Sequence, residues 1–281
     1  MPRELDVELA GIDALDLHLD EGLSRAHRFW SALWPKVTAA VLAMLVWQCV
    51  VWSQWKPEYI LPGPGKVLPA LSDLVRTGTF WSTVARTMWR GVKGYAIAVT
   101  VGSLLGLAVA RIAVLRTAIG SMITGLQTMP SVAWFPLAIV VFKLGESAIP
   151  FVVVLGAAPS IANGIITGVD HVPPLLLRAG RVVGARGVAT YRHVIIPAAL
   201  PAFVGGLKQG WAFAWRSLMA GELIATVPGH AGIGTGIDTA RQVSDYPGML
   251  AWMLVLLTVG ILIDSLFTRA DVSLRRRWGL L

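Results

Sequence analysis

Long apolar runs separated by short polar stretches dominate the 281-residue chain, and this pattern predicts membrane-spanning helices. The first run covers residues 37–55, which at 1.5 Å per residue gives about 28 Å, enough to cross a hydrocarbon core. Trp47, Trp52 and Trp55 gather toward its end, as expected for an interfacial aromatic belt. The sequence LPGPG at residues 61–65 then breaks regular structure, and a short interfacial helix is expected over residues 66–79.

The rest of the chain repeats this pattern and predicts an all-α, polytopic membrane protein with about six transmembrane helices. Four glycines in the second span, Gly91, Gly94, Gly102 and Gly106, suit close helix contact, because small residues let backbones approach each other in lipid. The third span is interrupted at Pro130 and Pro136. The predicted spans after the first are residues 80–111, 115–129 with 131–142, 149–169, 195–226 and 247–267.

Composition supports a membrane protein over a soluble one. The chain is 55% hydrophobic and 14% charged, whereas soluble domains carry about 25% charged residues. The net charge of +8 does not indicate nucleic-acid binding, because Lys and Arg gather in the loops between spans. The single cysteine, Cys49, excludes a disulfide framework.

No sequence pattern indicates catalysis or a cofactor. The phosphate-binding pattern G-x-x-x-x-G-K-[ST] is missing, and no His, Cys, Asp or Glu cluster has metal-ligand spacing. We therefore expect a chain without its own ATPase site, without a cofactor and without a metal. Energy for uphill transport has to come from a partner chain or from an ion.

An even number of spans places both termini on one side of the membrane, and the distribution of Lys and Arg favours the cytoplasm. Arg86, Arg90 and Lys93 count against this orientation, because they fall on the outer side. Residues 1–36 then form a cytoplasmic tail, either an acidic amphipathic helix or a solvated chain. The predicted divisions are this tail, a first transmembrane helix within 37–60, and a core over 61–281.

The most polar break between two spans is residues 170–197, which carry Arg178, Arg181, Arg186, Arg192 and His193 but no acid after Asp170. This stretch resembles the signature of bacterial ABC importer permeases, E-A-A-x3-G-x9-I-x-L-P. The two departures are Arg178, where the family usually has Glu, and Gly180, where it has Ala. The signature falls on Arg178, Ala179, Gly180, Gly184, Val194, Ile196 and Pro197.

Further segments resemble the nitrate, aliphatic sulfonate and taurine importer permeases. They are residues 129–137 (MPSVAWFPL), residues 144–147 (LGES), and residues 215–222 followed by Gly232-Ile233-Gly234. The resemblance covers roughly residue 61 to the C-terminus. It implies the type I ABC importer permease fold and a multi-pass subunit of the bacterial inner membrane.

The same resemblance implies partners and a mechanism. Two cytoplasmic ATPase subunits, a second permease copy (a homodimer) and an extracytoplasmic substrate-binding protein are expected. A short helix near 174–183, a reversal at Gly184 and a span starting at Pro197 would dock on the ATPase and transmit its closure as rigid-body motion. The solute is expected to be small and anionic, of the sulfonate, taurine or nitrate type, with thiamine precursors and riboflavin-like molecules also open.

Two groups of residues are candidates for lining the translocation pathway. The first flanks the break at Pro130, where freed backbone groups need protein or a cavity, although plain helix packing explains it too. The second lies on the fifth span, where a buried charge suggests function, although Lys208 and Arg216 can instead pair with Glu222 or Asp264. The candidates are Gln127, Met129, Ser131, Trp134, Trp215, Arg216 and Glu222.

Other polar features keep two interpretations each. Arg86, Arg90 and Lys93 share one helical face, which meets either anionic partners or lipid headgroups. The glycine-rich loop 229–236 is either an outer gate or a plain turn. Two other functions also compete with the permease: an ion-coupled secondary transporter, which calls for embedded acids or internal repeats, and a membrane scaffold that recruits a cytoplasmic enzyme.

Overall fold

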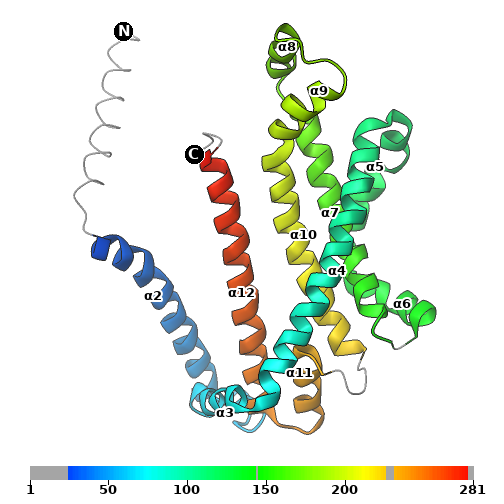
Figure 1. Cartoon of the computed structure of the whole chain (residues 1–281). Helices are drawn as coiled ribbons and strands as arrows, with labels where there is room; N and C mark the ends of the chain where they lie inside the picture. The colour runs from blue at the N-terminus through cyan, green and yellow to red at the C-terminus, as the bar shows by residue number, and fades with distance from the viewer. Residues whose placement is uncertain (1–24, 144, 226–230, 278–281) are drawn as a thin grey trace. The chain divides into compact units, whose positions relative to one another are not determined.

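The computed structural model describes residues 25–143, 145–225 and 231–277, and this part of the chain contains helices and no strands (Figure 1). It divides into two compact units, Met1–Lys66 and Val67–Leu281. The acidic stretch of the predicted N-terminal tail, residues 1–24, lies outside the described residues.

Helix α2 (Arg25–Trp52) forms most of the described part of the first unit. Its apolar portion, Leu33–Trp52, is long enough to cross a bilayer, and none of its most apolar window is buried inside the protein. Residues 25–36, which were assigned to the tail, are helical, so the helix begins before the expected start at residue 37. Pro35 lies inside the helix. Such an unburied apolar helix needs lipid or another protein around it.

Helix α3 begins in the last residues of the first unit, and the second unit contains the helices from α3 onward. They follow the predicted order closely. Their bounds are α3 (Pro64–Arg76), α4 (Gly78–Arg111), α5 (Ala113–Thr128), the 3-10 helix η1 (Ser131–Trp134), α6 (Phe135–Phe142), α7 (Ala148–Asp170), α8 (Pro174–Val182), α9 (Val188–Thr190), the π-helix η2 (Tyr191–Ile195), α10 (Ile196–Ile224), α11 (Ile233–Gln242) and α12 (Tyr246–Arg277).

The expected number of spans is confirmed in the described residues. Five helices are long and apolar enough to cross a membrane, or six if the bent pair α5 and η1–α6 counts as one span. That pair bends by 108° at the break next to Pro130, where a span interrupted by proline was expected. Residues 229–236 differ from the expected loop, because α11 begins at Ile233, while residues 226–230 lie outside the described part.

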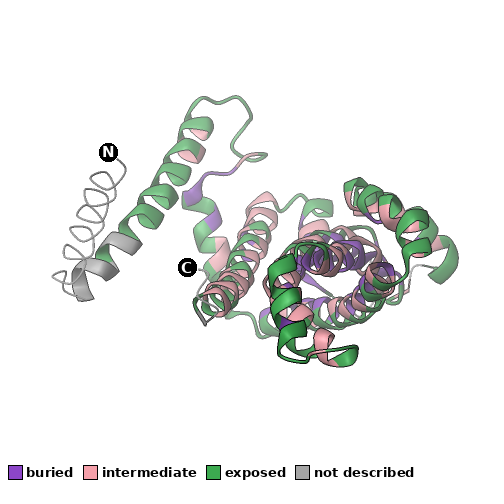
Figure 2. Ribbon diagram, turned by 90° about the horizontal axis from the view of Figure 1, so that it is seen from above, coloured by how far each residue is buried: buried purple, intermediate pink, exposed green. Residues whose placement is uncertain are grey.

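Helix α7 packs between α4 and α10, and the contacts use small residues, as the glycine pattern predicted. All four predicted glycines of α4 are buried. A Cβ atom on Gly102 would lie 2.6 Å from the carbonyl oxygen of Ala158, and one on Gly164 would lie 2.7 Å from the Cα of Gly206. Glycine lets these backbones touch, so α4, α7 and α10 form one tightly packed body (Figure 2).

Helix α12 joins this body through aromatic side chains. Phe267 packs against Tyr95 and Trp211 with ring centroids 6.1 and 5.8 Å apart. The Tyr95 hydroxyl donates a 2.8 Å hydrogen bond to the carbonyl of Leu207 in α10. Within the second unit, α8 and the last turns of α12 lie at one end, and α11 lies at the other (Figure 1).

Candidate functional site

The segment 170–197 folds as a short helix, a reversal and a second helical stretch. Helix α8 covers the expected position, and Gly184 after it has φ = +86°. Gly187 also lies in the left-handed region, at φ = +56°. Side-chain-bearing residues rarely adopt this conformation, so the two glycines permit the reversal. The amide of Ala185 donates to the carbonyl of Gly180 at 2.9 Å and closes the turn.

One of the two signature departures has a clear packing consequence. Gly180 is buried, and a Cβ atom there would lie 2.8 Å from Val194 Cγ2. The glycine therefore lets α8 lie directly on η2, and two positions of the signature touch each other. The other departure, Arg178, is exposed. Its cation faces solvent where the signature usually carries an acid.

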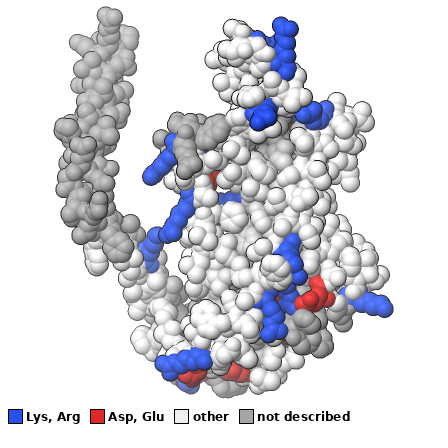
Figure 3. Space-filling model, viewed as in Figure 1, with Lys and Arg blue, Asp and Glu red and all other residues white. Residues whose placement is uncertain are grey.

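The outer surface of this segment is both apolar and basic. Val182 and Val183 are 87% and 83% exposed, and Leu175 and Val188 are also exposed. On the face drawn in Figure 3, basic side chains gather at this end of the second unit, with few acids nearby. Exposed aliphatic residues next to cations are typical of a protein-binding surface. We call Leu175, Val182, Val183 and Val188, with Arg178 and Arg181, the α8 surface.

Two contacts hold the base of the segment on the helices below it. Arg116, in the first turns of α5, forms a 2.8 Å ion pair with Asp170 at the end of α7. The guanidinium of Arg111, the last residue of α4, lies 3.8 Å from the centroid of the Tyr191 ring in η2. Pro197 follows η2 in the first turn of α10, where its missing N–H is tolerated. The segment that carries the α8 surface is thus held to α5 and α4 and continues into α10.

Of the pathway candidates near Pro130, three lie against other helices of the second unit and one is exposed. The Gln127 amide donates to the carbonyl of Pro159 at 3.2 Å. Ser131 lies 3.4 Å from where a Cβ of Gly156 would stand, and Trp134 packs against a buried cluster that includes Phe135 of α6 and Val152 of α7. Met129 is 40% exposed at the end of α5. The break therefore lies against α7 and α10.

The candidates on α10 separate into two environments. Trp215 and Arg216 line a cavity of about 510 Å³ between α10 and α12. The Arg216 guanidinium lies 5.3 Å from the centroid of the Phe213 ring. Lys208 donates to Thr268 at 2.8 Å and lies 3.9 Å from Asp264, which is the expected type of pairing. Glu222 lies apart from this cavity and is fully buried.

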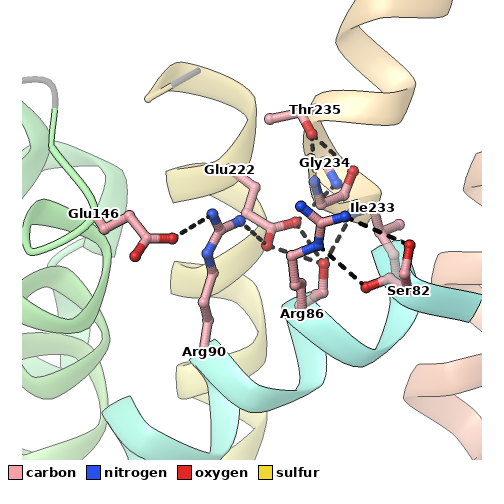
Figure 4. A network of polar contacts seen from close by, with 10 residues as sticks. Ser82, Arg86, Arg90, Glu146, Glu222, Ile233, Gly234 and Thr235 are labelled. Atoms are coloured by element: carbon pink, nitrogen blue, oxygen red, sulfur yellow. Dashed lines mark hydrogen bonds and ion pairs between the residues drawn. The ribbon is translucent and has the colours of Figure 1, made fainter. Parts of the chain in front are cut away.

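Glu222 is the centre of a buried polar network (Figure 4). The Thr87 hydroxyl lies 2.9 Å from Glu222 Oε1, and Arg90 Nη1 lies 3.0 Å from the same oxygen. The first turn of α11 adds the Gly234 amide, which donates to Oε2 at 3.0 Å. Arg90 Nη2 also reaches Glu146, 2.8 Å away, from the segment before α7. The network therefore joins α4, α10, α11 and the start of α7.

This network corrects the interpretation of Arg90. The residue shares a face with Arg86 and Lys93 in the sequence pattern, but its side chain is only 7% exposed and meets carboxylates instead of lipid headgroups. Two glycines make room for the network, because a Cβ on Gly232 would overlap the Glu222 carboxylate and one on Gly234 would lie 2.5 Å from Glu222 Cβ. This pairing was not predicted from the sequence.

Comparison with known proteins identifies relatives of the whole core. The family model for the "binding-protein-dependent transport system inner membrane component" matches residues 69–276, more than half of the chain. The taurine transport system permease protein of Escherichia coli is 28% identical over 81% of this chain and 83% of its own length. The riboflavin transport system permease protein of Chloroflexus aurantiacus is 28% identical over 87% and 92%.

A solved structure has the same fold. A chain of the MetNI methionine ABC transporter in an inward-facing conformation superposes with a TM-score of 0.54 at 24% identity. The superposition covers 73% of this chain and 98% of the other. The expected type I ABC importer permease fold is thereby confirmed.

Proposed function

Because the chain belongs to the family of binding-protein-dependent transport system inner membrane components, we propose that its segment 170–197 is the contact through which a separate ATPase drives it. The chain is a permease subunit of an ABC importer, and ATP hydrolysis takes place in other subunits. Family membership decides against the ion-coupled carrier and the scaffold. What the α8 surface binds and which solute passes are the proposals.

The exposed α8 surface is the observation that carries the ATPase proposal. Val182 and Val183 project into solvent from a backbone that Gly184 and Gly187 fold back. A surface that combines exposed aliphatic side chains with cations suits a groove in a soluble partner. Arg116–Asp170 and Arg111–Tyr191 fix the base of the segment to α5 and α4. A push on α8 therefore reaches several spans together.

Replacing one exposed valine tests this contact without disturbing the fold. Val182→Asp places a negative charge on the α8 surface, and we expect co-purification of the ATPase of the same transporter to be lost. Val243→Asp is the matched control, because Val243 is 69% exposed at the end of α11, on the opposite side of the second unit. Equal ATPase recovery with both variants would show that the surface lies elsewhere.

Bulk at the turn provides a second, independent test. Gly184→Trp combines a strained φ with a large side chain and is expected to abolish the complex while leaving membrane insertion intact. Gly78→Trp is the control, because a Cβ on either glycine would have no atom within 4 Å, but only Gly184 has a positive φ. If the complex survives Gly184→Trp, the docking turn is wrongly assigned.

We further propose a homodimer with both termini in the cytoplasm. The end of α12 lies at the same end of the second unit as α8, which supports a common side for the C-terminus and the ATPase contact (Figure 1). Activity of reporter enzymes fused to each terminus measures the orientation. Co-purification of two differently tagged copies, without a second permease type, measures the homodimer. A periplasmic signal from either terminus contradicts the orientation.

The solute is proposed to be a small anion. Arg216 supports this, because it lines the cavity between α10 and α12, where the carboxylate of Asp264 is paired with Lys208 at 3.9 Å. The taurine permease among the relatives transports a sulfonate-bearing amino acid by its name, whereas the riboflavin permease shows that the family is not restricted to such solutes. Binding of taurine, an alkyl sulfonate, nitrate and riboflavin to the cognate extracytoplasmic protein is the direct measurement. Riboflavin binding alone would contradict an anionic solute.

A further inference from the structure

A second cavity, of about 350 Å³, lies at the end of the second unit that carries the segment 170–197. Its walls come from the last turns of α4 and α7 and the first turns of α10, and most of them are apolar. Leu107, Val169, Leu200 and Phe203 are examples from the three helices. A cavity with such walls favours hydrocarbon over water or a hydrophilic solute.

One cation stands at the edge of this cavity. Arg111 lines it and is also exposed, so its charge lies where the cavity opens. The Tyr191 ring, 3.8 Å from the guanidinium, orients the side chain by a cation–π contact. Arg111 ends the apolar helix α4, which is the position where a span reaches the lipid headgroups. The cavity thus combines an apolar interior with a positive rim at headgroup depth.

We propose that this cavity binds an anionic phospholipid, with an acyl chain between α4 and α10 and the phosphate at Arg111. A basic pocket between spans on the cytoplasmic side is the known setting for anionic headgroups. A zwitterionic lipid would fill the same walls but would leave the Arg111 charge less well compensated. Placement in the cytoplasmic leaflet rests on the proposed function, since it assumes that segment 170–197 faces the cytoplasm.

The bound lipid would touch the joint between the ATPase contact and the core. Tyr191 and Ile195 of the π-helix η2 line the cavity, and η2 connects the segment 170–197 to α10. Single-turn π-helices occur frequently at functional positions because their wider turn is less regular than an α-helix. An acyl chain against η2 would therefore make coupling to the ATPase depend on the lipid composition of the membrane.

Native mass spectrometry of the purified full-length chain tests the site directly. The chain is titrated with phosphatidylglycerol and with phosphatidylcholine of the same acyl chains. We expect phosphatidylglycerol to bind more tightly, and Arg111→Gln to weaken its binding about fivefold, the effect of one cation near the bilayer surface. Phosphatidylcholine binding should change little. Leu107→Trp, which fills the cavity from α4, should weaken the binding of both lipids.

Arg192→Gln is the matched control, because Arg192 follows Tyr191 and is exposed but does not line the cavity. The proposal is overturned if Arg111→Gln and Arg192→Gln have equal effects, or if phosphatidylglycerol shows no preference. It is also overturned if Leu107→Trp disrupts association of two copies and leaves lipid binding intact, since a second copy would then occupy the cavity. These measurements use the chain without ATPase, so they stay separate from a failed ATPase contact.

Discussion

Replacing Glu222 by glutamine should destabilise the core far more than the same change at Glu146, the other carboxylate that contacts Arg90. Glutamine has nearly the same shape as glutamate, so the glycines around it keep their space. The substitution removes the negative charge that faces Arg90 and turns one acceptor oxygen into a donor group. That donor would face the Thr87 hydroxyl or the Gly234 amide, both of which approach Glu222 within 3.0 Å.

The expected magnitude follows from burial. Glu222 is fully buried, and removal of one partner from a buried ion pair costs about 3–5 kcal/mol. Glu146 still contacts Arg90 at 2.8 Å in the variant, so we expect the lower end, about 3 kcal/mol. Glu146→Gln is the matched comparison, because the Glu146 side chain is 46% exposed and a solvated ion pair contributes about 1 kcal/mol or less.

Thermal unfolding of the purified chain in one detergent measures this difference. At roughly 2–4 °C per kcal/mol for a chain of this size class, Glu222→Gln should lower the midpoint by about 6–12 °C and Glu146→Gln by less than about 4 °C. The double variant Arg90→Met/Glu222→Gln should cost less than the sum of its single variants, because no uncompensated charge then stays buried. Equal shifts for the two glutamates, or strict additivity with Arg90, would refute the reasoning.

Three further tests of helix packing use the same unfolding measurement, two of them with a second substitution for comparison. Gly206→Ala should be clearly destabilising, since its Cβ would lie 2.8 Å from an α7 backbone atom. A Cβ at Gly205 has nothing within 4 Å, so Gly205→Ala should be neutral or stabilising. Similar unfolding midpoints for the two variants would contradict the packing. Gly180→Ala should cost about 1–3 kcal/mol, and Val194→Ala should restore most of it if their contact is the cause. Tyr95→Phe should cost about 1 kcal/mol through its 2.8 Å bond to α10, and no change would mean that the bond is not formed.

The spans and the reversal at Gly184 were predictable from the sequence because their causes are local. Apolar length defines a span, and the proline at position 130 breaks one. Glycine at 184 has φ = +86°, as a reversal requires, and the buried glycines of α4 follow a spacing that one helix determines by itself. Each of these features depends on neighbouring residues: periodicity predicts the spans, and the resemblance to the permease signature marks Gly184 as the turn.

The partners of Arg90 were not predictable, because Thr87 and Arg90 in α4 meet Glu222 from α10 across more than a hundred residues. A helical face of cations contains no information about which carboxylate will approach it. The sequence pattern left Arg90 to meet either anionic partners or lipid headgroups, yet the residue is buried and pairs with Glu146 and Glu222. Only the three-dimensional arrangement of helices pairs charges at that distance in the chain.

The second unit combines a tightly packed body of α4, α7 and α10 with the exposed α8 surface at one end. Backbones that touch at Gly102 and at Gly164–Gly206 leave α4, α7 and α10 little freedom to slide past each other. The Glu222 network joins the same helices to α11 at the end away from α8. If α8 is the proposed ATPase contact, we expect its displacement to be transmitted by this body instead of being absorbed within it. The expected result is a rotation of the whole body, the rigid-body motion proposed for alternating access.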